Sequence, residues 1–197
     1  MEQAVQLPVN GLPAYGLEDY VADLRAIKAE TDDPPRVIER VRPLAQLMAE
    51  HKASWLKPEH YHCDEQQGVG LTLLHEEPGH TLAVFVVAWL PGRGVPPHNH
   101  GSWAVVAGID GPETNTFWKR VDDGSRTGHA KLVKAGEKVF HEGEVLSMLP
   151  GAIHSITNRT QQITVSLHTY GMHLNFAERS QFDLERDEEK PFILDIQ

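Results

Sequence analysis

Residues 91–103 read PGRGVPPHNHGSW, and they follow residues 81–90, the longest apolar run of the chain. His98 and His100 stand two positions apart, so in an extended segment their side chains point to the same face and both imidazoles can reach one metal ion. Neutral imidazole is the commonest protein ligand for metals. The stretch therefore predicts a metal-binding histidine pair at the end of a buried strand.

The chain from about residue 68 to residue 197 is predicted to form a β-barrel. Short β-rich runs alternate with turns rich in Gly, Pro, Asn and Asp, and no helical pattern lies between them. This pattern is typical of an antiparallel barrel or jelly roll, and thus of a mainly β fold. We expect strands at residues 70–75, 82–89, 103–109, 114–121, 129–133, 145–149, 155–158 and 163–170, and a charge-rich surface tail at residues 181–190.

The segment at about residues 15–57 is predicted to form a helical layer on one side of this barrel. The sequence Asp-Asp-Pro-Pro at residues 32–35 ends one helix and begins the next, and Pro43 is expected to kink or split the second helix. With the barrel, this layer makes one domain over residues 1–197. The first helix is indicated by an apolar residue at every third or fourth position, namely Leu17, Tyr20, Val21, Leu24 and Ile27.

A second histidine motif lies in residues 143–158. It begins at Gly143, turns at Pro150-Gly151 and continues to His154 and Asn158. Together the two histidine motifs resemble the two halves of the cupin metal motif, in which the second half usually has Pro-x-Gly where Pro-Gly stands here. The resemblance implies a cupin barrel, also called a double-stranded β-helix.

The resemblance also implies that His98, His100 and His154 hold the metal. The glutamate that usually follows the first pair is absent, since Ala104 and Val105 occupy the corresponding positions. Three neutral imidazoles leave the 2+ charge of a metal uncompensated, which suits an anionic substrate. Zn, Ni, Cu and Mn also accept three imidazoles, and three ordinary polar residues on a sheet are the alternative interpretation.

Three further polar residues share one face of a predicted strand. Ser166, His168 and Tyr170 alternate along residues 163–170, so they can form a chain of hydrogen bonds that ends in a phenol. With the three metal-binding candidates, they resemble the thiol dioxygenase branch of the cupins, the cysteine dioxygenase family. The resemblance implies a mononuclear non-haem Fe(II) enzyme in which these three residues are catalytic, and which uses O2 to oxidise a small thiol to a sulfinate.

Two departures from animal cysteine dioxygenases bear on the substrate. Their cysteine that is cross-linked to the active-site tyrosine corresponds by counting to Val105, and Cys63 is not expected to replace it. Their carboxylate-binding arginine corresponds to Thr72, with Gln66 and Gln67 nearby. We therefore expect an unmodified tyrosine and a different partner for the substrate carboxylate.

That partner is expected to be Arg179, nine residues after Tyr170. Its position looks like the bacterial 3-mercaptopropionate dioxygenase branch, which implies a mercapto-carboxylate substrate, either 3-mercaptopropionate or cysteine. Arg93 is a weaker candidate, with a surface charge as its alternative role. Trp103 and Phe117 are candidate pocket walls, although aromatic residues in strands are more often core residues.

Two alternative functions stay open, a metal-dependent cupin dioxygenase with a non-thiol carbon substrate and a non-catalytic cupin that binds a metal or ligand. A second His-x-His pair, His60 and His62, lies beside Cys63 and Asp64, and a solvated loop is favoured there over a second metal site.

Composition excludes several other classes of protein. The net charge of −10 argues against nucleic-acid and anionic-membrane partners, because a protein surface that binds them requires excess Lys and Arg. A single cysteine excludes an internal disulfide, and residues 1–4 lack the basic and apolar regions of a signal peptide. We expect a cytoplasmic protein whose partners are a small thiol and O2. The oligomeric state stays open.

Overall fold

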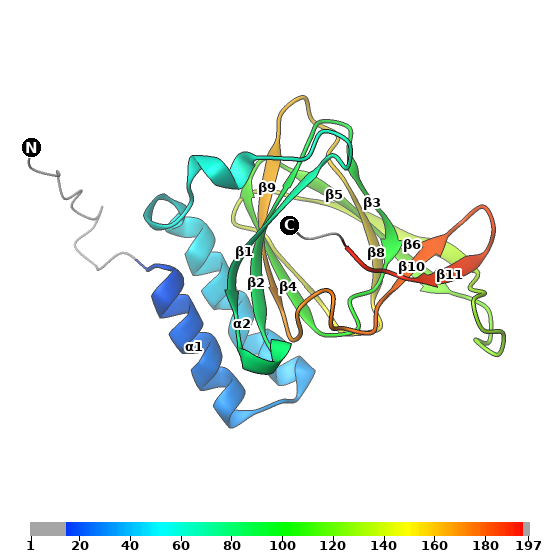
Figure 1. The fold of residues 1–197 in the computed structure, drawn as a ribbon, viewed down its shortest axis with the longest axis horizontal. Coiled ribbons are helices and arrows are strands. Elements are labelled where there is room, and N and C mark those ends of the chain that lie inside the picture. Colours follow the sequence, from blue (N-terminus) through cyan, green and yellow to red (C-terminus); the bar gives the residue numbers. More distant parts are fainter. Residues whose placement is uncertain (1–14, 195–197) are drawn as a thin grey trace, which may run out of the picture.

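Two antiparallel β-sheets face each other as a barrel, and two helices cover the outside of one of them (Figure 1). The structure is a computed structural model that describes residues 15–194, so the prediction about a signal peptide at residues 1–4 lies outside it. The five-stranded sheet has the order β1 (Val69–Glu76), β2 (Ala83–Trp89), β9 (Thr164–Tyr170), β4 (Ala104–Asp110) and β7 (Val145–Met148). The six-stranded sheet has the order β11 (Glu188–Pro191), β10 (Ser180–Asp183), β3 (Gly94–His98), β8 (Ile153–Thr157), β5 (Glu113–Arg120) and β6 (Leu132–Phe140).

The predicted fold class, a mainly β jelly-roll barrel with an N-terminal helical layer, is confirmed. In the five-stranded sheet, β2 and β9 are buried along their whole length. One face of each strand packs on the helices and the other faces the barrel interior, which explains the unbroken apolar run at residues 81–90.

The helical layer consists of α1 (Leu17–Glu30) and α2 (Pro34–Glu50), joined by three residues. Both helices bury an apolar stripe against the sheet, and the hydroxyl of Tyr20 is hydrogen-bonded to that of Thr169 at 2.7 Å. The expectation that Pro43 splits the second helix is wrong, because α2 runs through it. Pro43 lies on the exposed side of the helix, where water can satisfy the carbonyl that its missing N–H leaves free.

Alternation along β9 separates two cores. Val165 and Leu167 pack with the helices, whereas Tyr170 packs in the barrel interior. Ser166 and His168 share the side of Tyr170, since successive strand residues point to opposite faces. The polar residues of this strand are therefore carried into the barrel.

Several strand predictions need correction. The predicted strand at residues 129–133 is β6, which begins later and runs to Phe140. The strand β3 was not expected, because prolines remove donors that a sheet ladder needs. It tolerates them because its pairing with β8 is irregular between Val95 and His98 and because only His98 pairs with β10. The tail at residues 181–190 forms the hairpin of β10 and β11, in which Phe182 is buried.

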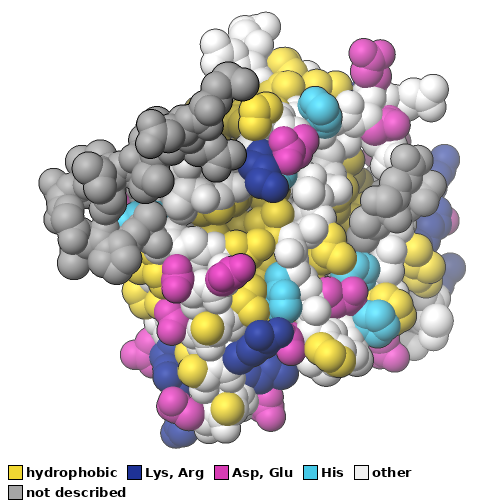
Figure 2. Space-filling model, turned by 60° about the vertical axis from the view of Figure 1, so that its left-hand side comes forward, with side chains coloured by type: hydrophobic (Ala, Val, Ile, Leu, Met, Phe, Trp, Pro, Cys, Tyr) yellow, Lys and Arg dark blue, Asp and Glu magenta, His cyan; other side chains and the backbone are white. Residues whose placement is uncertain are grey.

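Neither of the helices in residues 15–194 combines the length and the apolar character needed to cross a bilayer. On the described part of the face in Figure 2, Lys and Arg side chains are interspersed with Asp and Glu.

Candidate metal centre

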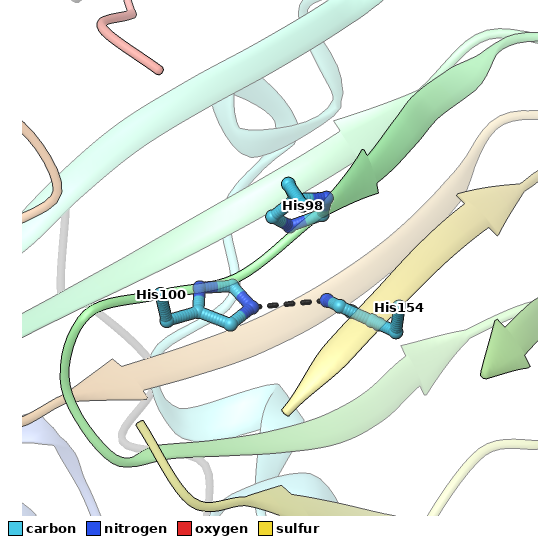
Figure 3. A group of neighbouring side chains, drawn as sticks. All are labelled: His98, His100 and His154. Carbon is cyan, nitrogen blue, oxygen red and sulfur yellow. Dashed lines mark hydrogen bonds between the residues drawn. The ribbon is translucent and has the colours of Figure 1, made fainter. Parts of the chain in front are cut away.

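His98, His100 and His154 converge inside the barrel (Figure 3). One ring nitrogen from each lies within 4.8 Å of the others, and all three side chains are buried. His98 ends β3 and pairs with His154 of β8, while His100 lies in the segment that follows β3. The structure thus brings together the three residues that the sequence motifs predicted.

Hydrogen bonds on the Nδ1 atoms orient two of the rings. The Nδ1–H of His98 donates to the carbonyl oxygen of Pro96 at 2.9 Å, and that of His154 donates to Oδ1 of Asn115 at 2.8 Å. A proton on Nδ1 leaves Nε2 of a neutral imidazole free to bind a metal. Nε2 of His154 lies 2.9 Å from Nε2 of His100. These nitrogens are therefore presented to a common point, as a metal site requires.

Burial keeps the three imidazoles neutral. It lowers the pKa of His98 to about 4 and places the pKa values of His100 and His154 well below the usual range for histidine. Neutral histidine is the form that binds metals. Within residues 15–194 no carboxylate or thiol joins this group, so the donor set fits a divalent metal held by three nitrogens, as the missing glutamate predicted.

The middle residue of the His-Asn-His stretch anchors the neighbouring strand. Asn99 donates its N–H to the carbonyl of Ser180 at 3.0 Å and accepts the N–H of Ser180 on Oδ1 at 2.8 Å. Gly101 has a φ of +62°, and a Cβ there would lie 2.3 Å from the carbonyl oxygen of Glu178. Glycine is therefore needed for residues 178–180 to pack against the histidine segment.

Ser166, His168 and Tyr170 form the predicted hydrogen-bonded chain. Oγ of Ser166 lies 2.8 Å from Nε2 of His168, and Nδ1 of His168 lies 2.7 Å from the hydroxyl of Tyr170. The Tyr170 ring centroid is 5.0 Å from that of His100. Burial raises the pKa of Tyr170 and lowers that of His168 to about 3, so the chain consists of neutral groups beside the histidines.

Glu113 extends this chain and was not predicted. Its two carboxyl oxygens lie 3.0 and 3.1 Å from Oγ of Ser166, and burial raises its pKa to about 7. Glu113 and Asn115 both project from β5: Glu113 contacts Ser166 of β9 in the opposite sheet, and Asn115 contacts His154 of the neighbouring strand β8. Both lie far along the chain from the residues they contact. No local motif marks them, and the predicted strand, which began at Thr114, left Glu113 outside it.

A cavity of about 190 Å³ lies beside the histidines and the hydrogen-bonded chain. Its polar side is formed by His98, His100, His168, Tyr170 and Arg179. The remaining lining is largely apolar and contains no Asp or Glu among the described residues; it includes Val69, Leu71, Val87, Trp89, Leu174, Phe192 and Leu194.

Arg179 is a buried cation in this cavity, with 5% of its surface exposed. Its Nε donates to the carbonyl of Phe192 at 3.0 Å, and its guanidinium carbon lies 4.2 Å from the centroid of the Phe192 ring. Nη2 is buried and has no hydrogen-bond partner among residues 15–194. Burial lowers the pKa of Arg179 to about 10, so the side chain stays charged at neutral pH.

The two positions compared with animal cysteine dioxygenases face away from the site. Val105 packs with the helices, and the residue opposite Tyr170 on β4 is Ala104. On β1, Val69 and Leu71 line the cavity. Thr72 directly follows Leu71 and precedes the bulge between Leu73 and His75, so its side chain points to the other face of the sheet. Counting along the sequence therefore selected two residues, Val105 and Thr72, that point away from the cavity. Neither Val105 nor Ala104, the residue that pairs with Tyr170, is a cysteine.

The predicted pocket walls are wrong. Trp103 lines a separate cavity between the helices and the sheet, and Phe117 packs in the barrel core outside the cavity lining. Arg93 is exposed and donates to the carbonyl of Gln66, so it is a surface charge. Gln67 does line the cavity.

The second His-x-His pair is only partly a solvated loop. His62 is exposed, whereas His60 is buried and its Nδ1 accepts the N–H of Lys57 at 3.1 Å. Cys63 packs against the helix-facing core, on the opposite side of the sheet from Tyr170. The pair does not form a metal-binding group in the described part of the chain.

No family model matches this chain. Similar solved structures include oxalate oxidase in complex with glycolate, at 20% identity and a TM-score of 0.42 over 54% of this chain and 52% of that chain. A cupin superfamily protein from Desulfitobacterium hafniense matches at 15% identity and a TM-score of 0.42 over 57% and 84% of the two chains. A protein with a double-stranded β-helix domain from Klebsiella pneumoniae matches at 15% identity and a TM-score of 0.41 over 65% and 96%. The match spans about half of the oxalate oxidase chain. The barrel is defined by the strand order of this chain itself.

Proposed function

We propose that this protein is an iron-dependent thiol dioxygenase that oxidises a small mercapto-carboxylate to its sulfinate with O2. The observation that carries the proposal is the position of Arg179. A buried guanidinium, with one nitrogen unpartnered among residues 15–194, lines the same cavity as Tyr170 and two of the three converging histidines, His98 and His100.

A buried charge is costly unless it is paired, and Arg179 is 5% exposed and contacts no carboxylate among residues 15–194. A substrate carboxylate would supply the missing counter-charge. A guanidinium suits this role because its fork binds two carboxylate oxygens at once. The substrate is therefore expected to be anionic at the end opposite its reacting sulfur.

The cavity favours 3-mercaptopropionate over cysteine. Cysteine would bring an ammonium group into a lining that contains Arg179 and no described Asp or Glu. An unpaired ammonium beside a guanidinium is unfavourable, so the pocket selects against it. A thiol acid without an amine brings no second cation beside Arg179.

His98, His100 and His154 would hold the metal through ring nitrogens. When bound, Fe(II) supplies a redox-active centre at which a thiolate and O2 can be brought together. The chain itself positions the substrate carboxylate at Arg179, excludes bulk water with Leu174 and the other apolar walls, and offers the hydroxyl of Tyr170 as a hydrogen-bond partner for the reacting groups.

The proposal includes a cytoplasmic location, where small thiols are kept reduced, and one domain that acts without nucleic-acid or membrane partners.

This function is tested by measuring oxygen uptake and metal content on the same protein sample. We expect uptake with 3-mercaptopropionate, weaker uptake with cysteine and the weakest with cysteamine, which lacks a carboxylate, in a sample whose main metal is iron. Uptake only with a non-thiol substrate would favour a carbon dioxygenase. Tight metal binding without uptake on any small thiol would favour a non-catalytic binding protein, and either result would overturn the proposal.

A further inference from the structure

We propose that Glu113 is a positioning residue whose proton sets the direction of the hydrogen-bond chain through Ser166 and His168, and thereby decides whether Tyr170 donates or accepts in the cavity. The inference deepens the proposed function and rests on it for its catalytic meaning. The chain of contacts stands on its own.

The four side chains are joined without a gap. Oγ of Ser166 lies within 3.1 Å of both carboxyl oxygens of Glu113 and 2.8 Å from Nε2 of His168, whose Nδ1 lies 2.7 Å from the Tyr170 hydroxyl. All four are at most 5% exposed, so water does not compete for these bonds. Each internal member must therefore donate on one side and accept on the other.

With Glu113 ionised, its carboxylate only accepts hydrogen bonds. The hydroxyl of Ser166 donates to it, and Oγ then accepts from Nε2–H of His168. The neutral imidazole has its lone pair on Nδ1 and accepts the proton of Tyr170. In this state the phenol proton points along the chain, and Tyr170 offers only oxygen lone pairs to the cavity.

With one proton added to Glu113, every bond reverses. The carboxylic acid donates to Oγ of Ser166, whose hydroxyl donates to Nε2 of His168. The imidazole proton then sits on Nδ1 and is donated to the oxygen of Tyr170. The phenol proton is free, and Tyr170 donates into the cavity that it lines.

The surroundings allow Glu113 to carry this proton near neutral pH. Ser166 and Thr164 of β9 face its carboxyl, and Phe140 stands opposite on β6. The titratable groups beyond them are His168, Tyr170 and, through Asn115 two residues along β5, His154. No Lys, Arg or second carboxylate among residues 15–194 shifts its pKa, which burial raises to about 7.

The tautomer of His168 reports the direction of the chain without any turnover. Long-range proton–nitrogen NMR correlations distinguish Nδ1–H from Nε2–H, and the spectrum of His168→Gln assigns the signals. We expect the wild-type protein, metal-free and loaded with Zn(II), to change from Nδ1–H to Nε2–H as pH rises through a midpoint near 7. Glu113→Gln and Ser166→Ala are expected to lose this change, and exposed Glu65→Gln is expected to keep it.

One His168 tautomer throughout the pH range in wild-type protein would overturn the inference, as would an unchanged midpoint in folded Glu113→Gln. Because the wild-type titration decides first, a variant that fails to fold does not stop the test. The measurement uses no substrate, so failure of this inference is distinguishable from failure of the proposed function, which the oxygen-uptake and product measurements decide.

Discussion

The Nδ1–H of His154 donates to Oδ1 of Asn115 at 2.8 Å, from a neighbouring strand of the same sheet. This bond fixes the ring tautomer and leaves Nε2 facing His100. The candidate metal centre therefore depends on a residue outside the histidine motifs.

Asn115→Ala is expected to weaken metal binding by about 10- to 100-fold, because a ligand imidazole loses the bond that orients it. Competition with a metal chelator measures the change in affinity. His154→Ala removes a ligand and is the reference for complete loss. An unchanged affinity in Asn115→Ala would show that the ring is held by packing alone.

Arg179→Ala is expected to raise KM for 3-mercaptopropionate by about 10- to 100-fold, since a charged hydrogen bond contributes about 1.5–3 kcal/mol. Cysteamine, which lacks a carboxylate, should show little change. Arg93→Ala, which removes an exposed arginine outside the cavity, is the matched control. Equal effects of Arg179→Ala on both thiols would argue against carboxylate pairing.

Tyr170→Phe is expected to lower kcat about 10²-fold while leaving the metal content unchanged, because a positioned proton donor is lost but no metal-binding histidine changes. Steady-state oxygen uptake and metal analysis measure the two quantities. Loss of metal together with activity would instead assign Tyr170 a structural role beside His100.

Glu113→Gln is expected to stabilise the metal-free protein at high pH and not at low pH. The folded-state pKa of Glu113, about 7, lies above the ordinary value of 4.5, so the folded protein binds this proton more tightly than the unfolded chain. The contribution of Glu113 to the free energy of unfolding is therefore fully present below pH 4.5, and it is lost as pH rises towards the folded-state pKa of about 7. A shift of this size corresponds to about 3 kcal/mol, to be measured by urea unfolding at pH 5 and pH 8. A gain that is equal at both pH values would contradict the raised pKa.

The residues of the site that the sequence predicts are mostly those related by short spacing along one extended segment. His98 and His100 stand two positions apart, as do Ser166 and His168, and His168 and Tyr170. Extended backbone places such residues on one face. The burial of both faces of β2 is likewise visible as an apolar run.

Contacts between distant strands are not encoded by spacing. Glu113 meets Ser166 across 53 residues, and Asn115 meets His154 across 39. Phe192 reaches Arg179 only because residues 181–190, which read as a polar tail, pair as a hairpin beside β3. The prolines of β3 hid that strand, because their tolerance depends on an irregular pairing that only the fold reveals.

The most direct test of the thiol dioxygenase function is the mass of the product formed from 3-mercaptopropionate under isotopically labelled O2. We expect iron-loaded protein to form the sulfinate with both oxygen atoms of one labelled O2 molecule, and His154→Ala to form none. A product without both labelled atoms, or no oxygen consumption by iron-loaded protein, would contradict the proposed function.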